Sequence, residues 1–163
     1  MNIKLIKDDV IRYRPDPKWI MDKNWKCRIY ISGYDRVEAN FITKAIEYYG
    51  NDLVEFYVDD KIVVTGKKKL NTDYINSFRQ AQNSNDILVN CAGITNSDCD
   101  FLFFKDPENE IYMLFGSENF VFNAMPIELS EYKRYYQELC DEAWYRENTI
   151  ILLKKIFLDY PKA

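Results

Sequence analysis

The chain has 163 residues, of which 47% are hydrophobic and 16% aromatic, so it has enough apolar area to form one packed domain over 1–163 and does not have the composition of a disordered chain. It contains no histidine, which excludes Ser-His-Asp and Cys-His catalysis, the HExxH zinc motif and histidine-ligated metals.

Its net charge of −4 comes from the second half of the chain. Residues 1–81 carry 15 basic and 12 acidic side chains, whereas residues 82–163 carry 7 basic and 14 acidic side chains. This balance argues against a nucleic-acid partner.

No apolar run approaches the ~20 residues that cross a bilayer, and residues 1–14 lack the apolar core of a signal peptide. We therefore expect a cytoplasmic protein with no membrane partner. The cysteines form no CxxC pair, so they are typical of buried apolar residues and indicate no metal or other cofactor. They are Cys27, Cys91, Cys99 and Cys140.

Hydrophobic periodicity and turn residues predict alternating strands and helices in the first half of the chain. A hairpin is expected around Asp59-Asp60, and Gly50 is a plausible end for the helix that precedes it. The predicted elements, in chain order, are short strands within 2–14, a strand at 26–32, a helix at 35–49, strands at 53–58 and 61–65, and a helix at 72–82.

The second half predicts strands at 86–92, 100–105 and 110–115, and the last two are expected to pair as a hairpin around residues 106–109. A long amphipathic helix follows, with Ser130 as its N-cap. Its predicted buried stripe consists of Tyr132, Tyr136, Leu139, Cys140 and Ala143, with Tyr135 at the edge. With a last helix at 149–158, the pattern predicts an α+β fold: a mostly antiparallel sheet covered on one face by helices, with a long amphipathic C-terminal helical region.

Residues 86–95 (DILVNCAGIT) resemble the strand and NAG element of short-chain dehydrogenases, and Val64-Thr65-Gly66 resembles their TG. The context of that family is missing, because three lysines follow Gly66 and no YxxxK motif occurs. The string is therefore interpreted as a buried strand that ends in a glycine turn.

Carboxylates are the candidates for catalysis in a chain without histidine. Asp98 and Asp100 lie close in sequence, and Asp106, Glu108 and Glu110 surround the predicted hairpin turn. Acidic residues are also common in turns, so an enzyme that uses carboxylates or Cys140 is kept as an alternative function, and no catalytic residue is assigned.

The outward face of the helix that begins near Ser130 is the main candidate for a binding surface. At about 100° per residue, its acidic side chains gather opposite the buried stripe together with Arg134 and an exposed tyrosine. Acidic and aromatic side chains together can steer and anchor a basic protein partner. The predicted partner-binding residues on this face are Glu131, Glu138, Asp141, Glu142 and Tyr145, with Trp144 at the rim. Glu108 and Glu110 in the hairpin turn are a second candidate, and an ordinary solvated helix face is the alternative interpretation.

The stretch from Asp100 to Trp144 (DFLFFKDPENEIYMLFGSENFVFNAMPIELSEYKRYYQELCDEAW) resembles, in type, the immunity proteins of bacterial polymorphic toxin systems, including contact-dependent growth inhibition. That resemblance implies a small acidic cytoplasmic protein that neutralises a cognate toxin domain, often a basic nuclease, without enzymatic activity. A phage-encoded inhibitor that mimics nucleic acid shares the acidic face and remains an alternative.

Overall fold

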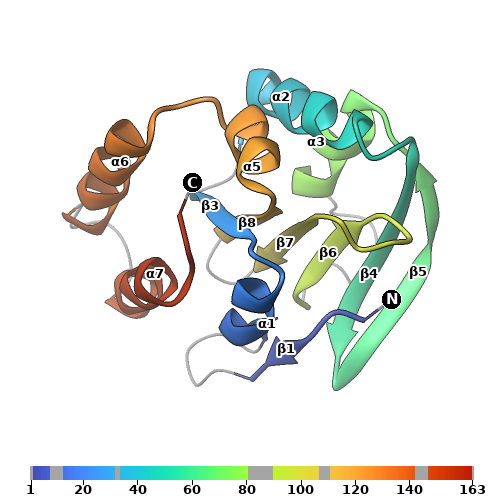
Figure 1. Ribbon diagram of the computed structural model, residues 1–163. Helices are drawn as coiled ribbons and strands as arrows, with labels where there is room; N and C mark the ends of the chain where they lie inside the picture. Colours follow the sequence, from blue (N-terminus) through green and yellow to red (C-terminus); the bar gives the residue numbers. More distant parts are fainter. Residues whose placement is uncertain are drawn as a thin grey trace.

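The computed structural model describes residues 2–7, 13–31, 34–80, 90–106, 111–141 and 147–162. Within these residues, a central antiparallel sheet has the strand order β3-β8-β7-β6-β4-β5, and β1 and β2 form a separate short ribbon (Figure 1). The strands are β1 (Leu5–Ile6), β2 (Arg14–Pro15), β3 (Lys26–Ile31), β4 (Asp52–Asp59), β5 (Lys61–Lys69), β6 (Ala92–Thr95), β7 (Leu102–Asp106) and β8 (Ile111–Gly116). The helices are α1 (Pro17–Asp22), α2 (Arg36–Glu47), α3 (Thr72–Gln80), α5 (Glu118–Ala124), α6 (Leu129–Asp141) and α7 (Glu147–Asp159). The predicted α+β class and antiparallel sheet are confirmed.

Both predicted hairpins are present in the sheet. β4 pairs with β5 along the register that runs from Asp59↔Lys61, next to the turn, to Asp52↔Lys69. Asp60, the turn residue between the two strands, has a positive φ of 36°. β7 pairs with β8 over the whole of β7, while the turn residues 107–110 lie outside the described residues. Local turn chemistry and alternation of apolar residues therefore predict these pairings correctly.

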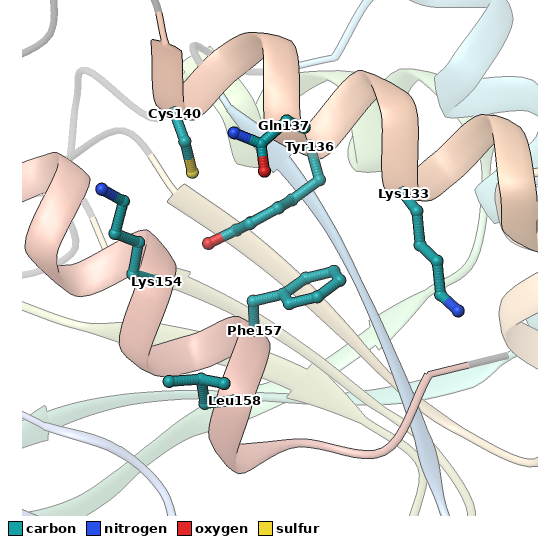
Figure 2. A pocket seen from close by; sticks show the side chains of 7 residues that line it. All are labelled: Lys133, Tyr136, Gln137, Cys140, Lys154, Phe157 and Leu158. Carbon is teal, nitrogen blue, oxygen red and sulfur yellow. The ribbon is translucent and has the colours of Figure 1, made fainter.

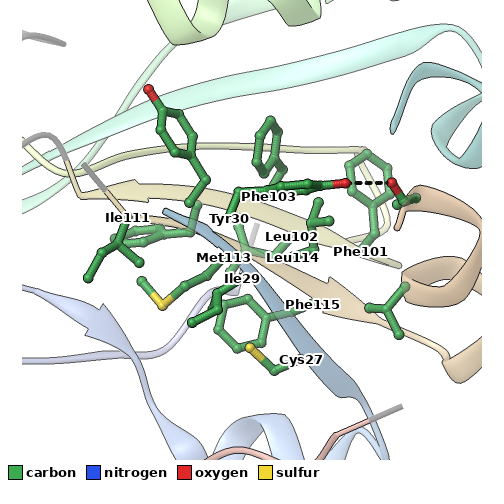
Figure 3. Packing of buried hydrophobic residues seen from close by; sticks show 14 of the residues in the cluster. Cys27, Ile29, Tyr30, Phe101, Leu102, Phe103, Ile111, Met113, Leu114 and Phe115 are labelled. Carbon is green, nitrogen blue, oxygen red and sulfur yellow. Dashed lines mark hydrogen bonds between the residues drawn. The ribbon is translucent and has the colours of Figure 1, made fainter. Parts of the chain in front are cut away.

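Helices α2, α3 and α5 lie on one face of the sheet, and α1 with the β1–β2 ribbon lies on the other (Figure 1). On the first face, the ring of Phe103 packs against Phe78 of α3, with centroids 5.4 Å apart. On the second face, the ring of Phe115 packs edge-on against Tyr160, 5.0 Å away. The apolar side chains between these layers are buried (Figure 3), so the sheet has a core on both faces, with β5 at its edge left mostly exposed.

Side-chain hydrogen bonds position two helices of the first layer. The Tyr30 hydroxyl donates to the carbonyl of Ala124 at the end of α5, 2.8 Å away (Figure 3). Helix α2 begins at a capping box, in which Asp35 accepts from the Glu38 N–H and Glu38 accepts from the Asp35 N–H. The first bond ties the end of α5 to β3, and the capping box defines where α2 begins.

The C-terminal segment closes the β3 edge of the sheet. The Cys27 N–H donates to the Pro161 carbonyl over 2.7 Å, and Lys162 forms a parallel bridge with Cys27. Arg14 of β2 forms a 2.7 Å ion pair with Asp159. As a result, α6 and α7 lie beside β3, at the end of the sheet opposite β5 (Figure 1).

Two local predictions are wrong. Gly93 does not form a turn after a strand: it lies inside β6, paired with Phe56 and Phe104, and residues 86–89 of the predicted strand lie outside the described residues. Ser130 is not an N-cap, because α6 already begins at Leu129 and the Tyr132 N–H donates to the Glu128 carbonyl. The backbone at Gly93 is held by pairing with β4 and β7 on its two sides. Ser130 follows a connection from α5 whose Met125 and Ile127 carbonyls accept hydrogen bonds from Arg28.

Candidate functional site

Helix α6 has a fixed rotation about its axis because its tyrosines are buried against β3. The Tyr132 hydroxyl accepts a hydrogen bond from the Ile29 N–H over 3.1 Å, and the Arg28 guanidinium lies 5.3 Å from the Tyr132 ring centroid. Tyr136 and Cys140, one and two turns further on, are also buried. The predicted buried stripe is confirmed at these three positions, while the side chain of Leu139 and the whole of Ala143 lie outside the described part.

The side of α6 that faces solvent carries three carboxylates, Glu131, Glu138 and Asp141, which we call the acidic ridge. Glu138 lies 3.8 Å from Arg134, and both side chains are about two-thirds exposed or more, at 66% and 72%. The Gln137 amide donates to both carboxylate oxygens of Asp141, at 3.0 and 2.9 Å. Exposed pairs of this kind typically stabilise a fold by less than about 1 kcal/mol, so folding alone gives little reason for this arrangement.

The structure thus brings together three of the eight predicted partner-binding residues. The spacing of three, four and seven residues between Glu131, Arg134, Glu138 and Asp141 places them on one face, as the helical period predicts. The other five predicted residues, Glu142, Trp144, Tyr145, Glu108 and Glu110, lie outside the described residues.

Beside the acidic ridge, α6 and α7 enclose an apolar groove of about 380 Å³, which we call the α6–α7 groove (Figure 2). Its floor is a stacked aromatic pair: the rings of Tyr136 and Phe157 are 4.2 Å apart and 20° from parallel. At its rim, Leu158 is 82% exposed. The lining residues are Lys133, Tyr136, Gln137, Cys140, Lys154, Phe157 and Leu158.

Sequence reasoning missed this groove. A signal for it was present, because Ile151 and Leu158 are seven residues apart and therefore share one face of α7. Both side chains are exposed, at 48% and 82%, although Leu152, Leu153 and Ile156 of the same helix are buried. The sequence shows that α7 is apolar on more than one side, but only the fold shows which side is left uncovered.

The polar side chains of the groove include one buried phenol, that of Tyr136. Burial raises the pKa of the Tyr136 phenol, and the nearby Cys140 thiol raises this pKa further, so the phenol is neutral near pH 7. Lys162 does not line the groove, but its ammonium lies 4.4 Å from the centroid of the Phe157 ring, and burial lowers the pKa of Lys162. The groove therefore offers an apolar surface, a neutral phenol and the aliphatic stems of lysines.

Of the carboxylates that were candidates for catalysis, the structure describes Asp98, Asp100 and Asp106, and these three do not form one cluster. Asp98 is exposed, and Asp100 serves its own loop, because its carboxylate accepts from the Asn96 amide over 2.7 Å. Asp106 is buried at the end of β7, and Glu108 and Glu110 lie outside the described residues. Among the residues that the structure describes, no group of three or more Cys, Asp or Glu side chains could hold a metal ion.

A second cavity, of about 470 Å³, lies where α5 meets α6 and is lined by Arg28, Glu118, Asn119, Phe122, Glu128 and Leu129. The guanidinium in this cavity has a structural role, because Arg28 donates to the carbonyls of Met125 and Ile127 and so holds the connection between the two helices. Burial lowers the pKa of Arg28.

Of the helices in the described ranges, none is both long and apolar enough to cross a membrane. Comparisons with protein-family models, with characterised proteins and with solved structures found no significant match.

Proposed function

We propose that this protein is a cytoplasmic immunity protein that binds and neutralises a basic toxin domain through α6, with no catalytic step of its own. The observation that carries the proposal is the position of the acidic ridge directly beside the α6–α7 groove. Glu131, Glu138 and Asp141 supply negative charge in solvent, and the groove next to them supplies uncovered apolar surface.

The two surfaces have complementary roles in binding. Exposed charges accelerate the encounter with an oppositely charged partner and lose this effect in salt. Affinity depends mainly on a few apolar or aromatic side chains that fill a pocket at the centre of the interface. Gln137 connects the two surfaces, because it lines the groove and its side-chain amide donates a hydrogen bond to Asp141 of the ridge. A basic toxin segment that carries one bulky apolar side chain would occupy both at once.

The partner is expected to be a basic domain such as a nuclease, because the acidic ridge imitates the charge of a phosphate backbone. A phage-encoded inhibitor of a nuclease would use the same surface. The position of the gene distinguishes an immunity protein from a phage inhibitor. The gene of an immunity protein lies directly downstream of a toxin gene, whereas the gene of a phage inhibitor lies among phage genes.

The test is co-expression of the tagged protein with the polypeptide encoded immediately upstream of its gene. We expect a stable 1:1 complex and rescue of growth from that polypeptide's toxicity. The variant Glu138→Lys with Asp141→Lys should lose at least about tenfold in affinity, since two attractive contacts become repulsive.

The matched control makes the same change in charge elsewhere, with Asp22→Lys and Glu47→Lys in the last turns of α1 and α2. Both residues are exposed and lie at helix C-termini, where lysine is favourable. The control should rescue growth as the wild type does. A ridge variant that rescues fully, or a control that fails equally, would show that α6 is not the binding surface.

A further inference from the structure

Within the part of the chain that the structure describes, β5 forms an open edge of the sheet. The other edge is covered, because the Pro161 carbonyl accepts from Cys27 and the Tyr132 hydroxyl accepts from Ile29 on β3. Among the described residues, no strand pairs with the outer side of β5. Most of its nine residues are exposed, including Val64 at 52%.

The backbone of β5 directs alternate peptide groups away from the sheet. The Leu70 N–H donates to the Asn51 carbonyl over 2.8 Å, so position 70 faces β4. Along a strand of an antiparallel ladder, the N–H and C=O groups of successive residues point alternately toward the paired strand and away from it. Lys69 and Lys67 therefore point these groups to the open side. Val58 of β4 donates to Cys91 on its other side, so its partner Ile62 also faces outward. The edge thus offers a row of free donors and acceptors for another strand.

The charge of this edge selects its occupant. Four of the nine residues are lysines, and only Lys68 has an ion pair among the described residues, 3.8 Å from Glu55. A second copy of the chain would place the same lysines opposite one another, which is unfavourable. An extended segment with acidic side chains would satisfy the peptide groups and the lysines together.

We propose that β5 binds an extended acidic peptide segment of a partner protein by adding it as a seventh strand. This site is independent of the proposed function, because β5 and α6 lie at opposite ends of the sheet (Figure 1). The lysines and the register shift at Glu55/Phe56 discourage pairing with neutral strands and with other copies, while an acidic strand is still admitted.

The test uses the full chain and a labelled peptide of alternating glutamate and valine, about as long as β5. We expect saturable 1:1 binding, with amide hydrogen exchange at Val64, Lys67 and Lys69 slowed about fivefold or more. Lys67→Pro removes an outward N–H without removing a bond to β4, and should weaken binding about tenfold. Lys67→Ala keeps that N–H and should weaken binding only about threefold.

Exchange in the wild-type protein tests the proposal even if Lys67→Pro unfolds. Unchanged exchange at these amides, equal binding of a lysine–valine peptide, or no saturable binding would overturn it. If Lys67→Pro and Lys67→Ala bound the acidic peptide with equal affinity, the outward N–H of residue 67 would take no part in binding. Binding would then depend on charge attraction alone, and strand addition would be overturned. Tighter binding of a single-stranded oligonucleotide than of the acidic peptide would assign the lysines to a nucleic acid instead.

Discussion

The missing side chain at Gly93 allows the ring of Phe56 to pack against the backbone of β6. A Cβ built at this position would lie 2.4 Å from Cζ of Phe56 and 3.2 Å from the Phe103 carbonyl oxygen. Both neighbours are fully buried, so neither can move into solvent. The glycine is therefore required by packing between adjacent strands, and its backbone does not have a positive φ.

We predict that Gly93→Ala lowers the free energy of unfolding by about 1–3 kcal/mol, because the added methyl group overpacks the core. Urea denaturation followed by tyrosine and tryptophan fluorescence measures the change. In a double-mutant cycle, Phe56→Leu should offset part of this loss by vacating the space. Strictly additive losses would show that the contact with Phe56 does not explain the glycine.

Among the helices, the α6–α7 groove keeps a large apolar side chain, that of Leu158, exposed to solvent at its rim. Leu158 remains exposed while it lines the groove, so its removal takes little apolar area out of the core. Leu158→Ala should therefore change the free energy of unfolding by less than about 0.5 kcal/mol.

The same variant should weaken the complex with the upstream-encoded polypeptide about tenfold, if the groove holds an apolar anchor from that partner. Titration calorimetry of the purified proteins measures the affinity. Val37→Ala is the matched control, because Val37 is another exposed aliphatic residue on a helix, 59% exposed on α2. Equal effects of the two substitutions would contradict a role for the groove in binding.

The elements that sequence predicts well are those whose signals are local. The Asp59-Asp60 turn predicts the β4–β5 hairpin, and the period of Tyr132, Tyr136 and Cys140 predicts both the buried side of α6 and the acidic ridge opposite it. The predictions for Gly93 and for the start of α6 are wrong because both positions depend on distant residues: Gly93 on its pairing with β4, and the α5–α6 connection on hydrogen bonds from Arg28 of β3. Ser130 is a favourable cap by composition, yet the chain arriving from α5 is already helical at Leu129.

The α6–α7 groove could not be predicted in the same way, because it is a relation between two helices. Tyr136 and Phe157 are 21 positions apart, and their stacking is produced by the packing of α6 and α7 beside β3. Likewise, the sequence predicts a strand only over 61–65, whereas β5 continues to Lys69 and the sheet order makes its lysines part of an open edge.

For the whole molecule, two charged surfaces of opposite sign lie far apart. The acidic ridge lies beside β3, and the lysines of β5 lie at the opposite end of the sheet. Under the proposed function, a basic partner would meet the acidic ridge at one end of the sheet and the β5 lysines at the other, so we expect it to approach α6.

The most direct test of this account is the salt dependence of the association rate between this protein and the upstream-encoded polypeptide, measured by stopped-flow fluorescence. For the wild type, the rate should fall steeply as ionic strength rises from about 10 mM to about 500 mM, because the Debye length shrinks. The Glu138→Lys, Asp141→Lys variant should associate about tenfold more slowly at low salt and depend less on salt. Identical rates and slopes for the two proteins would contradict the account, because the acidic ridge would then take no part in recognition.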